Sequence, residues 1–205
     1  MSEANSASSN PRREPRDPSI SSLVIRDVAL LIGLLTFWGA GDTWAHSSDL
    51  VIASLVATLG AALTGLALGA LWHEWGHFSG AIASGAKSRT VHPKGLSLVR
   101  FRFDFDANDS RQFHWMTLGG QIAHWLLVVL VLLAIPMDTA NRVALLAGAV
   151  AFAVFASTIE APVLKDSAQG VAPLQALRNN IDKAAFTRCR YIGGGAGILL
   201  FALLT

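Results

Sequence analysis

The chain has 205 residues, of which 52% are hydrophobic and 15% are charged, whereas about a quarter of the residues in a soluble domain are charged. This composition argues against a soluble enzyme, and the single cysteine excludes an internal disulfide or a four-cysteine metal site. The net charge of +2 comes from basic residues spread over several polar segments, which is typical of charges that set membrane topology, so we expect no nucleic-acid partner.

The start of the chain is polar, whereas the rest is dominated by long apolar runs. Residues 1–22 are rich in Ser, Pro and charge and predict a disordered cytoplasmic tail, although a signal peptide is a competing interpretation. About 20 mostly apolar residues cross a membrane. The sequence therefore predicts an all-α membrane protein, with about five transmembrane helices in a single domain over residues 23–205. Their apolar cores are residues 28–41, 50–71, 116–137, 143–164 and 191–204.

The distribution of Lys and Arg predicts how these helices are oriented. With five spans and a cytoplasmic N-terminus, every Lys and Arg except Arg142 lies on the cytoplasmic side. Cytoplasmic loops carry an excess of Lys and Arg in membrane proteins. We therefore expect the N-terminus in the cytoplasm and the C-terminus outside.

Two segments depart from a plain spanning pattern. Helical character continues from Leu50 to Ala86, which is longer than the bilayer core, so this helix either breaks near Gly60 or Gly65 or protrudes. Apolar and charged residues then alternate over residues 98–106, and a Pro-Lys-Gly turn signal stands just before them. This alternation predicts a small β-hairpin on the cytoplasmic side.

The sequence HEWGH, residues 73–77, carries the clearest chemical signal. On a helix, His73 and His77 lie one turn apart on the same face, so both imidazoles can bind one zinc ion. Glu74 lies beside them, in a position to take a proton from a zinc-bound water. Ionisable groups in membrane spans are costly and usually functional. A structural alternative is that the histidines form hydrogen bonds across the bundle and Glu74 pairs with a loop cation.

Three stretches resemble the site-2 protease family of intramembrane zinc metalloproteases. They are HEWGH at residues 73–77, GGQIAH at residues 119–124 and APVLKD at residues 161–166. The second stretch has Gln121 and His124 where the family usually has Pro and Asn. In the third, Lys165 is an apparent insertion and Ser167 replaces a Gly. The resemblance implies regulated intramembrane proteolysis, and the expected hairpin has a family counterpart that is thought to present the substrate.

The third metal ligand is open among three residues. Asp166 is implied by the resemblance, which places a ligand in the third stretch, and we expect it on non-helical backbone just past its span, at the end where the two histidines lie. Glu160 lies inside that span, where a carboxylate needs a partner. His124 lies about 12 Å into its own span and could also contact a substrate or the far side of a ligand. We expect Asp166 first, then Glu160, then His124.

Together these features predict an intramembrane zinc metalloendopeptidase with one Zn²⁺ per chain, acting on membrane-protein substrates within the lipid bilayer. Zinc-bound water is the expected nucleophile and Glu74 the general base. A helical substrate has to unwind, and strand addition along residues 99–105 would hold it extended. Two alternatives stay open: a non-proteolytic relative that binds membrane proteins, and a metal or proton transporter that uses the same His, Asp and Glu residues.

Overall fold

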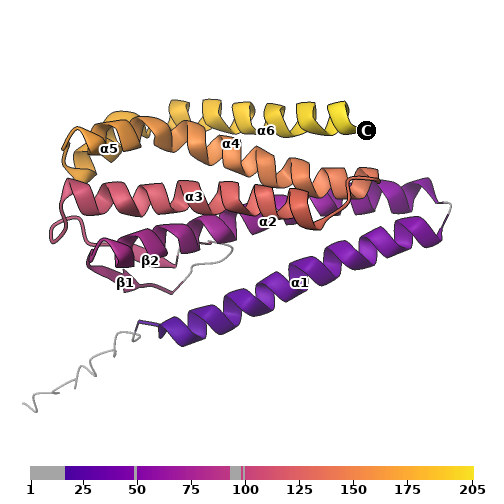
Figure 1. The fold of residues 1–205 in the computed structure, drawn as a ribbon, viewed down its shortest axis with the longest axis horizontal. Coiled ribbons are helices and arrows are strands. Elements are labelled where there is room, and N and C mark those ends of the chain that lie inside the picture. Colours follow the sequence, from indigo (N-terminus) through magenta and orange to yellow (C-terminus); the bar gives the residue numbers. More distant parts are fainter. Residues whose placement is uncertain (1–16, 49, 93–97, 99) are drawn as a thin grey trace, which may run out of the picture.

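The computed structural model describes residues 17–205 except residues 49, 93–97 and 99. Over this part of the chain, long helices run side by side along the molecule, and α5 and the two strands lie at the end opposite the C-terminus (Figure 1). The elements in chain order are α1 (Ile20–Ser47), α2 (Val51–Ala83), β1 (Ser88–Thr90), β2 (Phe101–Phe103), α3 (Ser110–Ala134), α4 (Ala140–Ala168), α5 (Pro173–Asn180) and α6 (Lys183–Leu204). Residues 1–16 of the expected tail lie outside the described residues, and α1 begins at Ile20.

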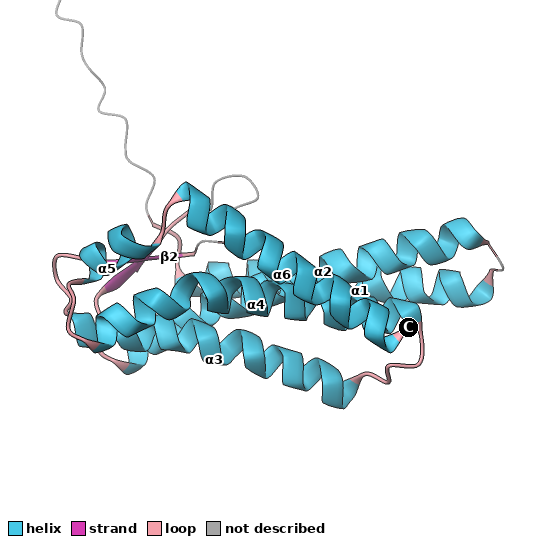
Figure 2. Ribbon diagram, turned by 90° about the horizontal axis from the view of Figure 1, so that it is seen from above, coloured by secondary structure: helices cyan, strands magenta, loops and turns pink. Residues whose placement is uncertain are grey.

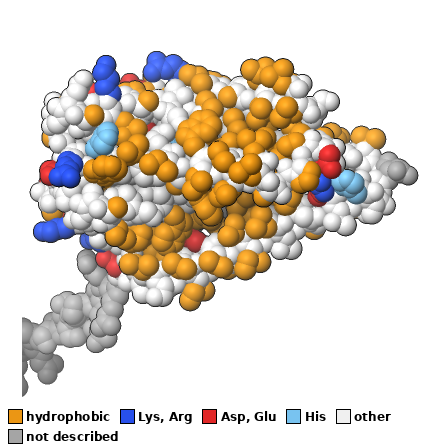
Figure 3. All heavy atoms as spheres, in the orientation of Figure 1, with side chains coloured by type: hydrophobic (Ala, Val, Ile, Leu, Met, Phe, Trp, Pro, Cys, Tyr) orange, Lys and Arg blue, Asp and Glu red, His pale blue; other side chains and the backbone are white. Residues whose placement is uncertain are grey.

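Four helices, α1 to α4, are long and apolar enough to cross a membrane by their length and composition. They cover the first four expected spans. The fifth expected span corresponds to α6, which is a helix but is not among these four. Its first half carries Lys183, Arg188 and Arg190, which lower its apolar content. The described part of the chain therefore has four candidate spans, and Figure 3 shows a broad apolar surface between polar ends.

α2 is a continuous helix of 33 residues, so of the two alternatives, a break near Gly60 or Gly65 and a protruding helix, the break is not observed. Such a helix is about 50 Å long, and its first turns project with the end of α1 beyond the other helices (Figures 1 and 2). Where α2 crosses α4, a side chain at Gly65 would collide with the backbone of Leu145, and one at Gly148 would collide with that of Ala62. Small residues at such crossings let membrane helices approach closely.

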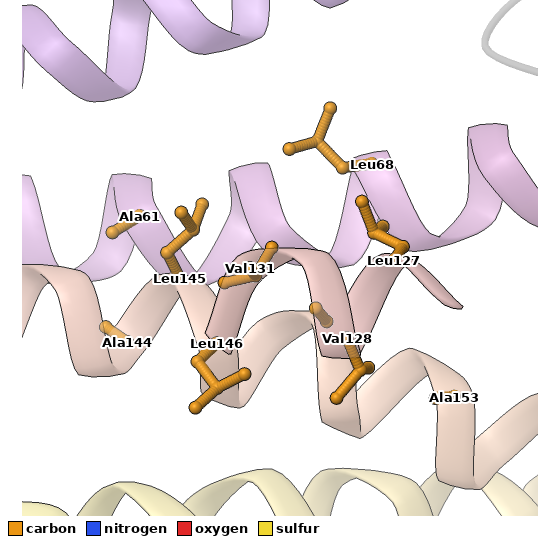
Figure 4. Packing of buried hydrophobic residues seen from close by; sticks show 10 residues of the cluster. Ala61, Leu68, Leu127, Val128, Val131, Ala144, Leu145, Leu146 and Ala153 are labelled. Carbon is orange, nitrogen blue, oxygen red and sulfur yellow. The ribbon is translucent and has the colours of Figure 1, made fainter. Parts of the chain in front are cut away.

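The main core lies between α2, α3 and α4, and Figure 4 shows side chains from all three helices meeting there. Leu145 and Leu146 of α4 are almost completely buried, and Leu68 of α2 and Val128 of α3 pack in the same cluster. The three helices therefore form one close-packed core. It fixes the faces that α2, α3 and α4 present to one another.

Side-chain caps and glycine turns set the helix boundaries. The N-cap oxygens accept backbone N–H groups at the starts of four helices, and those N-caps are Ser19, Asp109, Thr139 and Asp182. Gly85 and Gly170, with φ of 70° and 82°, follow the ends of α2 and α4. Only glycine adopts this left-handed conformation without strain, so both helices stop there.

The expected hairpin is present as a two-stranded antiparallel sheet in which Ser88 pairs with Phe103 and Thr90 with Phe101. The strand is shorter than the expected alternating segment, and the Pro-Lys-Gly turn lies outside the described residues. Phe103 is buried while Arg102 is exposed, which confirms the alternation. Phe101 stacks on Phe78 of α2 with 3.8 Å between ring centroids, so the sheet packs directly against the helix that carries HEWGH.

A buried ion pair attaches the start of α1 to this region. Asp27, which is 4% exposed, accepts hydrogen bonds from Nε of Arg100 at 3.0–3.1 Å, and Arg100 is 1% exposed. Nε1 of Trp75 also donates to Asp27 at 3.0 Å. Because Asp27 and Leu23 are the two buried residues of α1, this contact connects α1, the segment before β2 and the HEWGH helix at one point.

Candidate metal centre

The HEWGH sequence lies within the uninterrupted part of α2, so its side chains keep ideal helical spacing. His73 and His77 face the same side of the helix, with 4.3 Å between ring centroids and 3.0 Å between their Nε2 atoms. The expected pairing of the two imidazoles is therefore observed. One face of α2 presents two imidazole nitrogens to the neighbouring helices.

Glu160 of α4 completes this cluster. Its Oε1 lies 3.2 Å from Nε2 of His73 and 3.2 Å from Nε2 of His77. The side chains of Glu160, His73 and His77 are 14%, 9% and 19% exposed, respectively. These three residues thus bring one atom each to a common point and could hold a metal ion.

Hydrogen bonds fix which nitrogen of His77 carries its proton. Nδ1 of His77 lies 2.9 Å from the backbone oxygen of Met116. A carbonyl oxygen only accepts, so Nδ1 must be the donor. In the neutral ring, Nε2 then presents a bare lone pair to the cluster.

The tautomer of His73 is fixed by a series of hydrogen bonds that begins at Gln121. Nε2 of Gln121 faces two acceptors, Oε2 of Glu160 at 2.8 Å and the backbone oxygen of Ala156 at 3.3 Å. The amide orientation is therefore fixed, and Oε1 of Gln121 must accept the hydroxyl hydrogen of Ser157 at 2.8 Å. The hydroxyl of Ser157 has no second hydrogen to donate.

Ser157 in turn fixes His124 and then His73. Oγ of Ser157 accepts from Nε1 of Trp125 at 2.9 Å and lies 3.1 Å from Nε2 of His124, which must donate. The neutral His124 ring then has a bare Nδ1, 3.0 Å from Nδ1 of His73. Nδ1 of His73 donates to it, so Nε2 of His73 also presents a lone pair to the cluster.

With both rings neutral, three acceptor atoms therefore converge on one point, an arrangement that a cation satisfies. A proton bridges two of the atoms, whereas a metal ion takes all three. Two ligands of a tetrahedral zinc ion at 2.0–2.1 Å are about 3.3 Å apart, and the observed separations are 3.0, 3.2 and 3.2 Å. The donor set, two neutral imidazoles and one carboxylate, also suits zinc.

Gly120 of α3 makes room for the two rings. A Cβ atom at this position would lie 2.5 Å from Cε1 of His77 and 2.9 Å from Cε1 of His73. Both distances are shorter than any van der Waals contact, so a larger residue would push the rings out of place. The two rings can therefore occupy the observed positions beside α3 only because residue 120 has no side chain.

Asp166, the first expected third ligand, does not join the cluster. It lies within α4, and its Oδ2 accepts a hydrogen bond from Nδ2 of Asn180 in α5 at 2.8 Å. Its backbone oxygen accepts the N–H of Val171 in the turn that ends α4. Residue 166 is six positions after Glu160, about 9 Å along the axis and about 120° around it. The expectation that residue 166 has non-helical backbone is wrong.

Glu74 and His124 take different places around the cluster. Glu74 is half-buried, about 60° around the helix from His77, and its carboxylate makes no hydrogen bond or ion pair with any described residue. His124 is 1% exposed and contacts the far nitrogen of His73. It therefore occupies the alternative position considered for it, on the far side of a histidine.

Sequence reasoning did not assign roles to Gln121, Ser157 or Trp125, although all three contribute polar contacts around the cluster. The available signal was their polarity within apolar segments, where hydrogen-bonding side chains usually pair across helices. Comparisons of the chain with models of protein families, with characterised proteins and with solved structures found no match. The function is therefore inferred from the geometry of the site.

Proposed function

We propose that the protein is a zinc-dependent endopeptidase that acts on membrane-protein segments, with His73, His77 and Glu160 as the metal ligands. The observation that carries this proposal is the convergence of three potential ligand atoms, one each from His73, His77 and Glu160, within 3.2 Å of one another. A catalytic zinc site has three protein ligands and one open position. Glu160 replaces Asp166 in this proposal because Asp166 is hydrogen-bonded to Asn180 instead.

Each residue has a distinct task in the proposed reaction. A zinc ion bound here supplies an activated water and a Lewis acid for the peptide carbonyl. Glu74 accepts a proton from the attacking water and returns it to the leaving amine. The lack of a hydrogen-bonding partner among described residues supports this role, because the carboxylate is free to exchange protons.

The hairpin supports a substrate in extended form. A helical segment hides its peptide carbonyls in its own hydrogen bonds, so it must unwind before hydrolysis. Phe101 of β2 stacks on Phe78, the residue that directly follows His77. A substrate strand added along β2 would therefore belong to a sheet that packs against the helix that carries HEWGH.

The proposal includes five spans, with α6 as the fifth, a cytoplasmic N-terminus and an outer C-terminus. Lys and Arg side chains gather at the end of the molecule that holds the hairpin and α5 (Figure 3). Arg142 lies at the start of α4, at the opposite end. By the positive-inside rule, this distribution supports a hairpin on the cytoplasmic side.

The hydrogen bonds around the cluster favour an enzyme over a transporter. A proton or metal relay needs polar groups that lead from one side of the membrane to the other. Here the contacts from His73 pass through His124, Ser157 and Gln121 and return to Glu160. Among the described residues, the network is thus a closed ring around one site.

The test uses purified protein in detergent and in proteoliposomes that contain fluorescently labelled transmembrane peptides. Wild type should hold one zinc per chain by mass spectrometry and cleave at least one peptide, and chelation should stop cleavage. Glu74→Gln should keep the zinc and lose at least 100-fold in cleavage rate. Asp138→Asn, a change of an exposed acid, is the matched control. Equal cleavage by Glu74→Gln would contradict the mechanism, and zinc flux without cleavage would favour a transporter.

A further inference from the structure

The hydrogen bonds that surround the metal cluster all point in one direction. His73 donates to His124, His124 to Ser157, Ser157 to Gln121, and Gln121 to Oε2 of Glu160. With both rings neutral, the direction is fixed because Gln121 also donates to the oxygen of Ala156 and Trp125 donates to Ser157. The chain of hydrogen bonds begins and ends on two residues of the same cluster.

This direction determines which atom is left free for a cation at each end of the chain of hydrogen bonds. At Glu160 it supplies a donor to Oε2, which leaves Oε1 free for a cation. At His73 it draws the ring proton to Nδ1, which leaves Nε2 free for the same cation. The step between His124 and His73 is the decisive one, because a bare Nδ1 on His124 accepts only from a protonated Nδ1 on His73.

We propose that His124 is a positioning residue, which sets the His73 tautomer and ring orientation by accepting a hydrogen bond at its own Nδ1. His124 is 1% exposed, so water cannot take over this acceptor role. Partners of this kind, on the far nitrogen of a ligand histidine, typically change metal affinity 10- to 100-fold. The inference rests on the metal centre of the proposed function, but it does not depend on peptide hydrolysis.

Three substitutions separate an acceptor role from simple packing. Asn places its Oδ1 where His124 has Nδ1, so His124→Asn should restore the acceptor. Gln carries its carboxamide one bond further out, and His124→Gln should not. His124→Leu fills a similar volume without any polar atom. Because Asn and Gln both keep a polar group in the buried position, their comparison holds even where the Leu variant gives little folded protein.

The experiment measures Zn²⁺ affinity by competition with a chromogenic chelator, using detergent-purified full-length protein. His124→Leu and His124→Gln should lose 10- to 100-fold in affinity, whereas His124→Asn should stay within about threefold of wild type. His46→Leu, at a half-exposed histidine in α1, is the control. Thermal melting of each variant checks folding.

The outcomes separate this inference from the proposed function. Equal affinity in all three His124 variants would overturn the positioning role, and so would an Asn variant as weak as the Leu variant. Zinc binding by wild type would still stand in both cases. A wild-type protein without measurable Zn²⁺ affinity would instead refute the metal centre and this inference with it.

Discussion

Replacing Glu160 by Gln should remove the metal while keeping the protein folded. The Gln side chain has the same shape, and its amide NH₂ carries two hydrogens. With the NH₂ at the position of Oε1, it can donate to Nε2 of His73 and of His77, each 3.2 Å away. Its oxygen then takes the place of Oε2 and accepts from Gln121, as Glu160 does at 2.8 Å. The amide thus gives the two imidazole nitrogens and Gln121 their hydrogen-bonding partners without any cation.

The expected changes in zinc affinity and melting temperature follow from this replacement of a carboxylate by an amide. Glu160→Gln should weaken zinc binding more than 100-fold, a loss of about 2.8 kcal/mol or more, because a ligand charge is lost and amide hydrogens occupy the metal position. Its melting temperature should stay close to that of wild type. Glu160→Leu should lose zinc too, but it leaves two buried imidazole nitrogens without partners, at about 1–3 kcal/mol each. It should therefore melt at a lower temperature than Glu160→Gln.

The assay is thermal denaturation of detergent-purified protein with excess zinc and with excess chelator. Wild type should melt at a higher temperature with zinc, because a ligand that binds the folded state stabilises it. Glu160→Gln should show the same melting temperature in both conditions. Asp166→Asn is the matched control and should respond to zinc as wild type does. A Glu160→Gln protein that responds like wild type, beside an unresponsive Asp166→Asn protein, would return the third ligand to Asp166.

Three further predictions test the surroundings of the site. Gly120→Ala should lower zinc affinity at least tenfold in the chelator assay, because its Cβ would displace both histidine rings; Gly194→Ala, with no atom within 4 Å of the added Cβ, should have no effect. Asp27→Leu should cost about 3–5 kcal/mol of stability, measured by denaturation, because it removes the carboxylate that accepts hydrogen bonds from the buried Arg100; unchanged stability would mean that α1 is held by other contacts. A reporter fused after Asp106 should be cytoplasmic and one after Thr139 external, and the opposite result would reverse the proposed orientation.

The helices and the hairpin could be predicted closely from sequence patterns. Long apolar runs have few other solutions than helices, because every backbone group in a membrane must be hydrogen-bonded within its own segment. The period-two alternation around Phe101 and Phe103 likewise predicts a strand, and it is present over residues 101–103. Composition defines the fifth span less sharply, since Arg188 and Arg190 interrupt the apolar character of α6.

Helical spacing within one segment was predictable, whereas the contacts between segments were not. His73 and His77 are four residues apart, so their pairing depends only on α2 being helical. The choice between Glu160 and Asp166 depends on how far α4 continues and which face it turns to α2. α4 runs to Ala168, and Gly170, whose φ is positive, follows its end. The residues before Gly170 carry no sequence signal that distinguishes a helix that ends before Asp166 from one that includes it.

Two of the residues that depart from the family pattern, Gln121 and His124, belong to one connected group of hydrogen bonds with Ser157 and Glu160, and this connection explains why they occur together. Gln121 stands where the resemblance predicts proline, and a proline has no N–H to offer Oε2 of Glu160. A buried carboxylate oxygen without a donor is costly, so a glutamate at position 160 requires a donor such as Gln121. Ser157 and His124 are then required by Gln121, because each needs the next as its hydrogen-bonding partner. In the proposed site, a third ligand on α4 two residues before Pro162, in place of Asp166, therefore requires a polar face on α3 as well.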